Sequence, residues 1–308
     1  MNLHEIQTFL SIAQAGGVTR AAGRLHRSQP AVTRRMKLLE AQLGAPLIER
    51  VRGGVVLTEA GRAFLPHAEA VLAALRDGAD AVRGIAEDES SGTVSLALVG
   101  TLAGTPVLAQ LRAFGRSHPG VRLELRTANS QETSDLVRRG EATLGLRYFE
   151  DSSAALASRA VAQERMVIAC SSEHPLAGKR MRDARALRGD RWVSFPAARL
   201  GNDSFALLLR RTIAAAGLDG MDVVPIDSMT AQKRMIEAGF GIGLLPESGI
   251  LEELRLGTLA TIDVPRLRAV VPVAVVHRRE GYLGAAARAL LALIGGTRVA
   301  PRGGKRRR

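Results

Sequence analysis

Apolar residues recur every three or four positions along the first 44 residues, which is the spacing of amphipathic helices. The first helix is predicted to begin almost at Met1, with apolar positions at Leu3, Ile6, Phe9, Leu10 and Ala13. Two further helix starts follow about ten residues apart, since Thr19 can cap a short helix and Ser28 a longer one, with Gln29 and Pro30 in its first turn. The apolar positions of the short helix are Ala21, Ala22 and Leu25, and those of the longer helix are Val32, Met36, Leu39 and Leu43.

A short helix, a tight turn and a longer helix with a polar and basic start are typical of a helix-turn-helix, in which the second helix enters the major groove of DNA. Gln29 can pair with adenine, Arg34 with guanine or phosphate, and Thr33 with a phosphate or a thymine methyl group. Residues 20–52 hold eight arginines and lysines against two glutamates, a local charge of +6. The spacing leaves an ordinary amphipathic helix pair with a solvated basic face equally open.

A hairpin is predicted after the longer helix, which Gly44-Ala-Pro46 ends. Two short extended runs lie on either side of Gly53 and Gly54, as in a hairpin. Directly after a helix-turn-helix, such a hairpin is the wing of a winged helix, and Arg50 and Arg52 lie where it can meet phosphate or the minor groove. The alternative is an exposed hairpin with incidental charge.

A long amphipathic helix is predicted from a cap at Thr58 to about Gly84. Its apolar stripe consists of Phe64, Ala68, Val71, Leu72, Leu75, Ala79 and Val82. No neighbouring element would cover this stripe, whereas two copies packed antiparallel would. The alternative is a core helix of the next domain.

The pattern changes after the acidic and small residues 87–92, which are interpreted as a hinge and domain boundary. Strands then alternate with helices, which predicts a parallel α/β sheet. The predicted strands are 94–99, 121–125, 143–146, 165–170, 191–194, 222–226, 241–245 and 270–277. The predicted helices are 102–116, 131–139, 203–216, 229–238, 247–254 and 282–294.

Ligands of parallel sheets bind outside the carboxyl ends of the strands. The residues predicted at these ends are Gly100, Thr101, Leu102, Asn129, Ser130, Arg147, Ser194, Phe195, Met229 and Thr230. Thr101 and Ser130 each precede a helix, whose free N–H groups accept an anion. Taken singly, each polar residue is better explained as a helix cap, but together they favour a pocket. Arg147 could neutralise a ligand carboxylate or form a surface ion pair, and an aromatic content of 3% favours a small polar anion over a stacked aromatic ligand.

The length of 308 residues suits two or three domains, and the net charge of +13 favours a polyanionic partner, with nucleic acid ahead of an anionic membrane. Six of these charges lie in residues 298–308, which are expected to form a disordered tail. Cys170 lies in an apolar run, which indicates a buried structural thiol. There is no secretory signal and no apolar stretch that spans a bilayer, so a cytoplasmic protein without a membrane partner is expected.

Motifs of catalysis are absent from the sequence, which has no G-x-S-x-G, no H-E-x-x-H and no Walker loop. The six histidines have no ligand spacing, so neither a metal nor another cofactor is expected. Residues 239–243 look faintly like a dinucleotide loop, but they follow a helix and precede a strand, which is the wrong order. The rival interpretation is a cytoplasmic solute-binding or small-molecule-processing α/β protein without a role on DNA.

Several runs closely resemble the N-terminal domain of LysR-type transcriptional regulators. They are Phe9–Ala13, Thr19–Ala22, Leu25–Arg34, Leu39–Glu40, Leu43–Gly44, Ala45–Arg50 and Leu57–Gly61. Val18 and Ile48 stand where this family usually has an aromatic residue, and Arg27 stands where a small residue is common and adds a phosphate contact. Looser matches to the effector domain of the family are His118–Val121, Asn129–Ser130, His174–Leu176, Ala238–Pro246 and Tyr282–Leu283.

The resemblance implies an α/β regulator whose domains follow the family order. These are a winged helix-turn-helix in residues 1–58, a dimerising linker helix and hinge in 59–90, a two-lobed effector domain like a periplasmic binding protein in 91–297, and the tail. Lobe I would take about 91–161 and 267–297, and lobe II about 162–266. The effector would bind between the lobes.

The partners implied by the resemblance are double-stranded DNA, a small-molecule effector and further copies of the chain, as a dimer that assembles to a tetramer. RNA polymerase stays open as a further partner. The residues expected to contact DNA are Thr19, Arg20, Arg27, Ser28, Gln29, Pro30, Thr33, Arg34, Lys37, Arg50 and Arg52.

Overall fold

The computed structural model describes residues 1–85, 91–104, 106–196, 205–218 and 220–296. The chain folds as two compact units, one made mainly of Met1–Ala86 and the other mainly of the residues that follow. Each unit is described by itself. The predicted tail at 298–308 and most of the predicted hinge at 87–92 lie outside the described residues.

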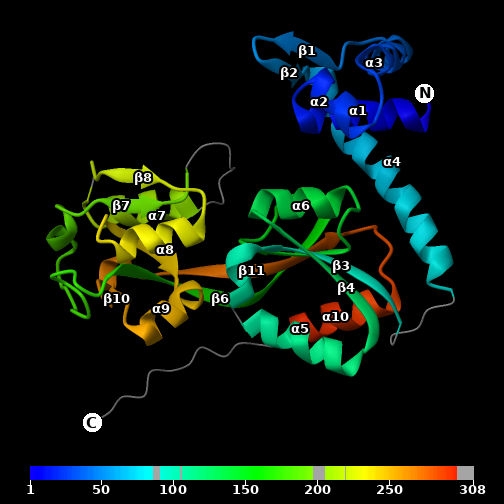
Figure 1. Cartoon of the computed structure of the whole chain (residues 1–308). Coiled ribbons are helices and arrows are strands. Elements are labelled where there is room, and N and C mark those ends of the chain that lie inside the picture. Colours follow the sequence, from blue (N-terminus) through cyan, green and yellow to red (C-terminus); the bar gives the residue numbers. More distant parts are fainter. Residues whose placement is uncertain (86–90, 105, 197–204, 219, 297–308) are drawn as a thin grey trace. The chain divides into compact units, whose positions relative to one another are not determined.

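The first unit is a winged helix-turn-helix followed by a long helix (Figure 1). Its elements are α1 (Leu3–Ala15), α2 (Val18–Arg24), α3 (Gln29–Leu43), β1 (Ile48–Val51), β2 (Gly54–Leu57) and α4 (Glu59–Arg83). Strands β1 and β2 form the predicted antiparallel hairpin. The core is apolar and completely buried at Phe9, Ile12, Ala21, Val32 and Leu39. The prediction for this part of the chain is therefore confirmed element by element.

The helix ends confirm some of the predicted caps and correct others. Gly44 ends α3 in the left-handed conformation with φ 71°, and the Thr58 hydroxyl caps α4 by accepting the Gly61 N–H at 3.0 Å. Thr19 is not a cap, because Gly17 holds that position and α2 begins at Val18. Ser28 does precede α3, but its side chain makes no capping hydrogen bond.

The buried stripe of α3 is one residue shorter than predicted. Val32, Met36 and Leu39 are buried, whereas Leu43 is 39% exposed. Leu43 is the last residue of α3, and the chain turns away at Gly44. It therefore lies beyond the helices that cover the other three side chains.

Helix α4 keeps most of its apolar stripe on the surface of the first unit. The helix runs without a break through Pro66 and buries Ala68 and Ala73. Val71, Leu75 and Val82 are 41%, 53% and 70% exposed. The prediction that no neighbouring element covers this part of the stripe is confirmed for the described residues.

The second unit is built on one mixed sheet of nine strands, ordered β4-β3-β5-β11-β6-β9-β7-β8 with β10 beside β6. The strands are β3 (Ser91–Val99), β4 (Gly120–Ala128), β5 (Leu144–Tyr148), β6 (Leu156–Ser171), β7 (Trp192–Ser194), β8 (Val223–Pro225), β9 (Ile242–Pro246), β10 (Leu259–Ile262) and β11 (Ala269–Arg278). The α-helices are α5 (Pro106–Ser117), α6 (Ser130–Arg138), α7 (Phe205–Ala215), α8 (Met229–Glu237), α9 (Leu251–Leu256) and α10 (Ala285–Gly296). Four short 3-10 helices complete the unit: η1 (Gly100–Gly104), η2 (Ala184–Leu187), η3 (Glu247–Ile250) and η4 (Pro265–Leu267).

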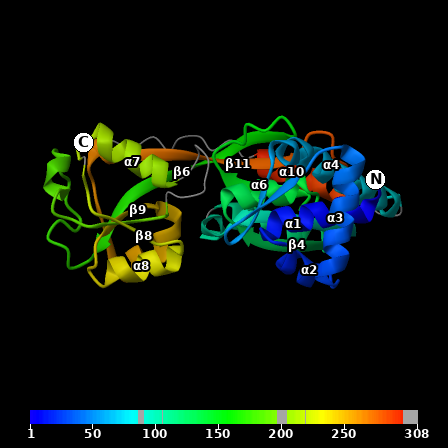
Figure 2. The ribbon, with the colours of Figure 1, turned by 90° about the horizontal axis from the view of Figure 1, so that it is seen from above.

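The predicted parallel pairing holds in two groups of strands but not in the middle of the sheet. Strands β3, β4 and β5 are parallel to one another, and so are β7, β8 and β9. Between these groups, the long strands β6 and β11 pair antiparallel over most of their length and join both groups (Figure 2). The sheet therefore consists of two parallel groups held together by one antiparallel pair.

Two strands were missed by the prediction, the first half of β6 and the whole of β10. The apolar residues of 156–164 are interrupted by serine, arginine, glutamine and glutamate, and their longest apolar run is the three residues 160–162. They are held as a strand by their ladder to β11. Strand β10 has only four residues and pairs with the end of β6.

The largest apolar cluster of the second unit holds most of its bulky side chains, and two smaller buried clusters complete the core. Trp192, Tyr148 and Phe114 are completely buried in it. Cys170 is buried as well, and this burial raises the pKa of its thiol to about 11, which confirms the predicted structural thiol. Within the part of the chain that the structure describes, none of the helices is both long and apolar enough to span a bilayer.

The contact between α4 and the wing gives a first testable prediction. A Cβ atom at Gly61 would overlap the carbonyl oxygen of Leu47, whereas Gly78 in the same helix has open space around it. We expect Gly61→Ala to destabilise the first unit by about 1–3 kcal/mol, because backbone must move to admit the methyl group. Gly78→Ala should stabilise the helix by up to about 1 kcal/mol. Thermal unfolding followed by circular dichroism measures both, and equal effects of the two variants would contradict the close contact.

Candidate functional site

The start of α3 presents a polar and basic surface. Gln29, Pro30, Arg34 and Lys37 are exposed and Thr33 is half-buried, whereas Val32, Met36 and Leu39 point into the core. The turn before α3 is tight, since His26 takes a positive φ of 50°. Arg27 and Ser28 are exposed in this turn, directly before the first residue of the helix. This surface can hydrogen-bond to base edges and phosphates.

The wing adds two further cations to the surface of the first unit. Arg50 lies on β1 opposite Val55, and Arg52 lies in the turn that leads to Gly53. Gly53 has a φ of 103°, a conformation that favours glycine. Both arginines are exposed, as is Thr19 on α2.

Arg20 is exposed, as a predicted DNA contact would be, and it also forms hydrogen bonds within the first unit. Its Nε donates to the carbonyl of Ala15 at 2.6 Å, and its Nη2 donates to the carbonyl of Gly16 at 2.7 Å. The Gly16 carbonyl also accepts the N–H of Val55 in the wing at 3.0 Å. Arg20 therefore fixes the turn between α1 and α2, at the point where the wing is attached.

Glu40 is a residue of the first unit that sequence reasoning missed. Its Oε1 accepts the N–H groups of Leu47 and Ile48 at 2.8 and 3.3 Å, which ties α3 to the start of the wing. The signal was present in the sequence, because Glu40 is one of two acidic residues in the basic stretch 20–52. A carboxylate in such a basic stretch indicates a structural role, in which it accepts hydrogen bonds from nearby groups.

In the second unit, Thr101 and Leu102 follow β3 in η1. The Thr101 hydroxyl donates to the Tyr148 hydroxyl at 3.0 Å. Leu102 is completely buried in the apolar core, so its side chain serves packing. Gly100 is exposed.

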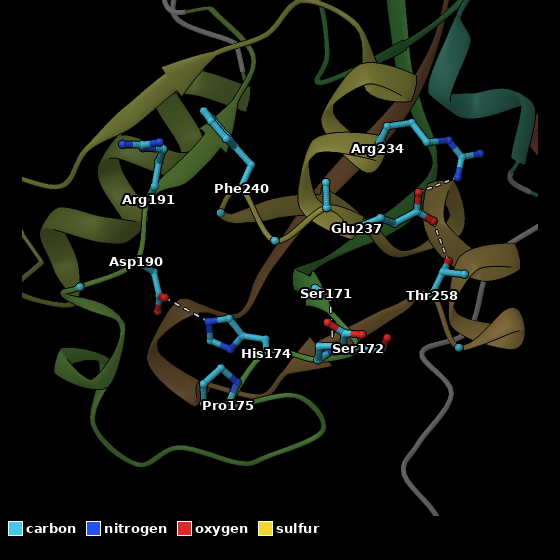
Figure 3. A pocket seen from close by; sticks show the side chains of 16 residues that line it. Ser171, Ser172, His174, Pro175, Asp190, Arg191, Arg234, Glu237, Phe240 and Thr258 are labelled. Carbon is cyan, nitrogen blue, oxygen red and sulfur yellow. Dashed lines mark hydrogen bonds and ion pairs between the residues drawn. The ribbon is translucent and has the colours of Figure 1, made fainter.

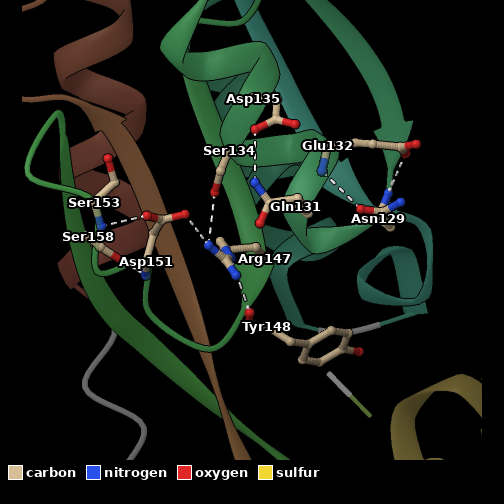
Figure 4. Close-up of polar contacts among 10 residues, drawn as sticks. All are labelled: Asn129, Gln131, Glu132, Ser134, Asp135, Arg147, Tyr148, Asp151, Ser153 and Ser158. Carbon is tan, nitrogen blue, oxygen red and sulfur yellow. Dashed lines mark hydrogen bonds and ion pairs between the residues drawn. The ribbon is translucent and has the colours of Figure 1, made fainter. Parts of the chain in front are cut away.

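Asn129 and Ser130 lie at the start of α6. Asn129 accepts the Glu132 N–H at 2.9 Å, and Glu132 accepts the Asn129 N–H at 3.1 Å, a reciprocal cap of the helix (Figure 4). The helix-cap alternative therefore holds for Asn129. Ser130 is the first residue of the helix and is half-buried.

Arg147 forms an ion pair within the chain. Its guanidinium pairs with Asp151 and donates to the Ser134 hydroxyl at 2.9 Å, and its side chain is only 5% exposed (Figure 4). The pair is thus buried and not a surface pair. Tyr148 follows Arg147 in β5, so the two side chains point to opposite faces of the sheet. Arg147 is consequently not beside Thr101, which bonds to Tyr148.

The remaining predicted residues come from the other half of the sheet. Ser194 is buried at the end of β7, Phe195 follows it, and Met229 and Thr230 form the first turn of α8, which Ser228 caps. A Cβ atom at Gly249 would come within 2.8 Å of the Met229 Cε, so Met229 lies against η3. Helix η3 in turn packs against η1, which carries Thr101. The fold thus brings the regions of Thr101 and Met229 both against η3.

A pocket of about 980 Å³ lies elsewhere in the second unit (Figure 3). It is formed before β7 and β9, at the opposite ends of these strands from Ser194. Several of its polar side chains pair with one another: His174 with Asp190, Arg234 with Glu237, and Glu237 with Thr258. Arg191 pairs instead with Asp222, which does not line the pocket. None of the predicted ligand residues lines it. Among the described residues, no group of His, Cys, Asp and Glu is placed to hold a metal ion.

Known proteins match both units. Residues 3–62 match the family described as bacterial regulatory helix-turn-helix protein, lysR family, and residues 87–297 match the LysR substrate binding domain. The HTH-type transcriptional regulator TfdS of Cupriavidus pinatubonensis is 31% identical over 279 residues, which cover 90% of this chain and 92% of that protein. The HTH-type transcriptional regulator TcbR of Pseudomonas sp. strain P51 is 30% identical and covers 91% of this chain and 94% of that protein.

Solved structures agree with these relatives. The crystal structure of CbnR, a LysR family transcriptional regulator, is 29% identical with a TM-score of 0.56 and covers 96% of this chain and 100% of that one. Full-length CbnR complexed with its target DNA is 27% identical with the same TM-score and covers 96% of this chain and 98% of that one.

A winged helix-turn-helix followed by a long helix and a mixed α/β domain defines a DNA-binding transcriptional regulator with an effector-binding domain. The chain belongs to the LysR family of bacterial transcriptional regulators, as its motifs predicted.

Glu40 provides the test of how the wing is held. Glu40→Leu should leave the N–H groups of Leu47 and Ile48 without their acceptor, which costs about 1–3 kcal/mol for a buried group. We expect a lower unfolding midpoint and weaker DNA binding. Glu49 on β1 is exposed and provides a matched control, since Glu49→Leu also removes a negative charge but no such acceptor. Equal loss of stability in the two variants would show that charge, and not the Glu40 bonds, is responsible.

Proposed function

We propose that the first unit recognises double-stranded DNA through the start of α3. Gln29, Pro30, Thr33 and Arg34 face the base edges in the major groove. The exposed polar face of α3 is the observation that carries this proposal, because the opposite face is needed for the core. Phosphate contacts come from residues around this face, namely Thr19, Arg27, Ser28, Lys37, Arg50 and Arg52. Arg20 supports this surface indirectly, because its hydrogen bonds fix the turn between α1 and α2.

The proposed domain layout follows the sequence prediction. Residues 1–58 bind DNA, 59–90 link and dimerise, 91–297 bind the effector, and 298–308 form a basic tail. Within the effector domain, one lobe takes about 91–161 and 267–297 and the other about 162–266. Strands β6 and β11 support this division, because they are the connection between the two parallel groups of the sheet. A regulator of bacterial promoters acts in the cytoplasm.

Dimerisation through α4 accounts for its exposed apolar stripe. Val71, Leu75 and Val82 recur at intervals of four and seven residues, so they form one side of the helix. A second copy of α4 packed antiparallel would remove this stripe from water and set the distance between two α3 helices. Two such dimers would make the tetramer that the family resemblance implies. We assign no surface to RNA polymerase.

The effector is proposed to bind where the two lobes meet, near Thr101, Ser130, Ser194, Met229 and Thr230. The convergence of η1 and α8 on η3 supports this position. A small molecule that binds one arrangement of the lobes more tightly shifts the population toward it. The free energy that couples effector binding to DNA binding then comes from the difference in effector affinity between the two arrangements.

The DNA proposal is tested by equilibrium binding to duplexes selected from a random pool, at graded salt. Arg34→Ala should weaken the selected site by about 1–3 kcal/mol, roughly 5- to 150-fold, if Arg34 reads a guanine. Arg255→Ala removes the same charge from an exposed position of the second unit and should leave affinity unchanged. Unaltered affinity in a folded Arg34→Ala variant, or an equal loss in both variants, would contradict the assignment of α3.

Leu75 provides the test of the α4 interface. Leu75→Glu places a charge in the middle of the exposed stripe and should dissociate the dimer, which sedimentation velocity detects. Ala70 is exposed about a quarter of a turn away from the stripe, so Ala70→Glu should leave the assembly intact. A dimer that survives Leu75→Glu, or that is lost equally in both variants, would contradict assembly through this stripe.

A further inference from the structure

The register of the central strands places a buried carboxylate on the same face of the sheet as Tyr148. Tyr148 is level with Val273 of β11, and Val273 is level with Ala162 of β6. Glu164 lies two residues beyond Ala162 in β6, so its side chain points to the same face as those of Ala162 and Tyr148. Thr101 donates to Tyr148, and Ser248 donates to Glu164. We refer to Thr101, Tyr148, Glu164 and Ser248 as the polar cluster.

The polar cluster lies where the proposed effector residues meet. Thr101 is in η1 and Ser248 is in η3, and these two short helices pack together. Met229 of α8 lies against Gly249, the next residue of η3. The cluster therefore draws on η1, β5, β6 and η3, which come from both halves of the sheet.

Glu164 is held by neutral groups. Its Oε1 accepts the Ser248 N–H at 3.0 Å, its Oε2 accepts the Ser248 hydroxyl at 2.9 Å, and the residue is 6% exposed. Across the described residues, no arginine, lysine or histidine forms an ion pair with it. Burial raises the pKa of Glu164, and the neighbouring carboxylate of Glu247 raises it further.

The arginines next to Tyr148 and Glu164 in sequence form ion pairs with other residues. Arg147 points to the opposite face of β5 and pairs with Asp151. Arg165 points to the opposite face of β6 from Glu164, and its Nε donates to Glu247 at 2.8 Å. The polar cluster itself therefore holds one carboxylate and three hydroxyl groups. Lys233 of α8 reaches the neighbouring residue of η3, where its Nζ donates to the Gly249 carbonyl at 3.2 Å, and its charge is paired with Glu253 at 2.6 Å.

We propose that Glu164 determines the charge of the effector, which is a small neutral or cationic molecule that donates hydrogen bonds to this carboxylate. The inference rests on the proposed effector site. A ligand carboxylate at this place would lie beside a desolvated negative charge, and like charges in a buried site oppose one another. An ammonium or hydroxyl group would instead supply the donors that Ser248 now provides. The polar anion expected from composition fits this surface poorly.

The test uses the full chain and two probes that share a carbon skeleton, butylammonium chloride and sodium butyrate, at equal ionic strength. Apparent dissociation constants come from the dependence of the unfolding midpoint on probe concentration. We expect butylammonium to bind the native chain at least tenfold more tightly than butyrate. Glu164→Gln keeps an acceptor for Ser248 but removes the charge, so this preference should disappear. Glu164→Asp keeps the charge and should retain most of the preference.

Two outcomes would overturn the inference. The first is no preference for butylammonium in the native chain. The second is a preference that persists in Glu164→Gln. If the unfolding midpoint of that variant without any probe is also lower, Glu164 acts only as a cap for η3.

Ser130→Ala separates this inference from the proposed effector site, because Ser130 belongs to that site but not to the polar cluster. One possible result is that Ser130→Ala weakens the binding of both probes while no charge preference depends on Glu164. This result would overturn the charge inference and leave the effector site in place. Binding of both probes that neither Ser130→Ala nor Glu164→Gln alters would overturn the site as well.

Discussion

The antiparallel pairing of β6 with β11 is the interaction on which the second unit depends. Each parallel group alone is a small sheet of three strands, and the long pair is the element that connects the two groups by hydrogen bonds. The register of this pair shifts between Val273 and Ala274. Glu164 pairs with Val271 in this ladder, and the pairing fixes the face of the sheet to which the Glu164 side chain points. The pairing therefore decides which side chains from distant parts of the chain lie on one face.

In the first unit, the corresponding constraint is the attachment of the wing to the helices. Glu40 binds two N–H groups at the start of β1, Thr58 donates to the Pro46 carbonyl at 2.6 Å, and Gly61 allows α4 to pass directly over Leu47. Arg20 holds the other side of the wing through the Gly16 carbonyl. All of these contacts are made between residues of the first unit. Together they keep the exposed residues of α3 and the wing in one fixed surface, which recognition of a rigid duplex needs.

An element of this fold could be predicted from the sequence when the residues that determine it are neighbours in the chain. Helices of the first unit were predictable because their apolar spacing and their ends at Gly44 and Thr58 are local features. Caps were less predictable, since Thr19 and Gly17 compete for one position and only the path of the chain decides between them. The first half of β6 was not predictable, because its longest apolar run has only three residues and its ladder partner lies about a hundred residues away in β11.

The predicted ligand residues also depend on contacts between distant parts of the chain. Thr101 and Met229 were predicted from their places after strands, and that rule uses only the order of elements. Arg147 and Tyr148 also end a strand, but the alternation of side chains puts the arginine beside Asp151 and the tyrosine beside Thr101. The sequence could not tell which of these side chains share a face, since that depends on how β5, β11 and β6 pair. The register puts Tyr148 and Glu164 on one face and Arg147 on the other, so the charge that we propose for the effector follows from strand pairing and not from composition.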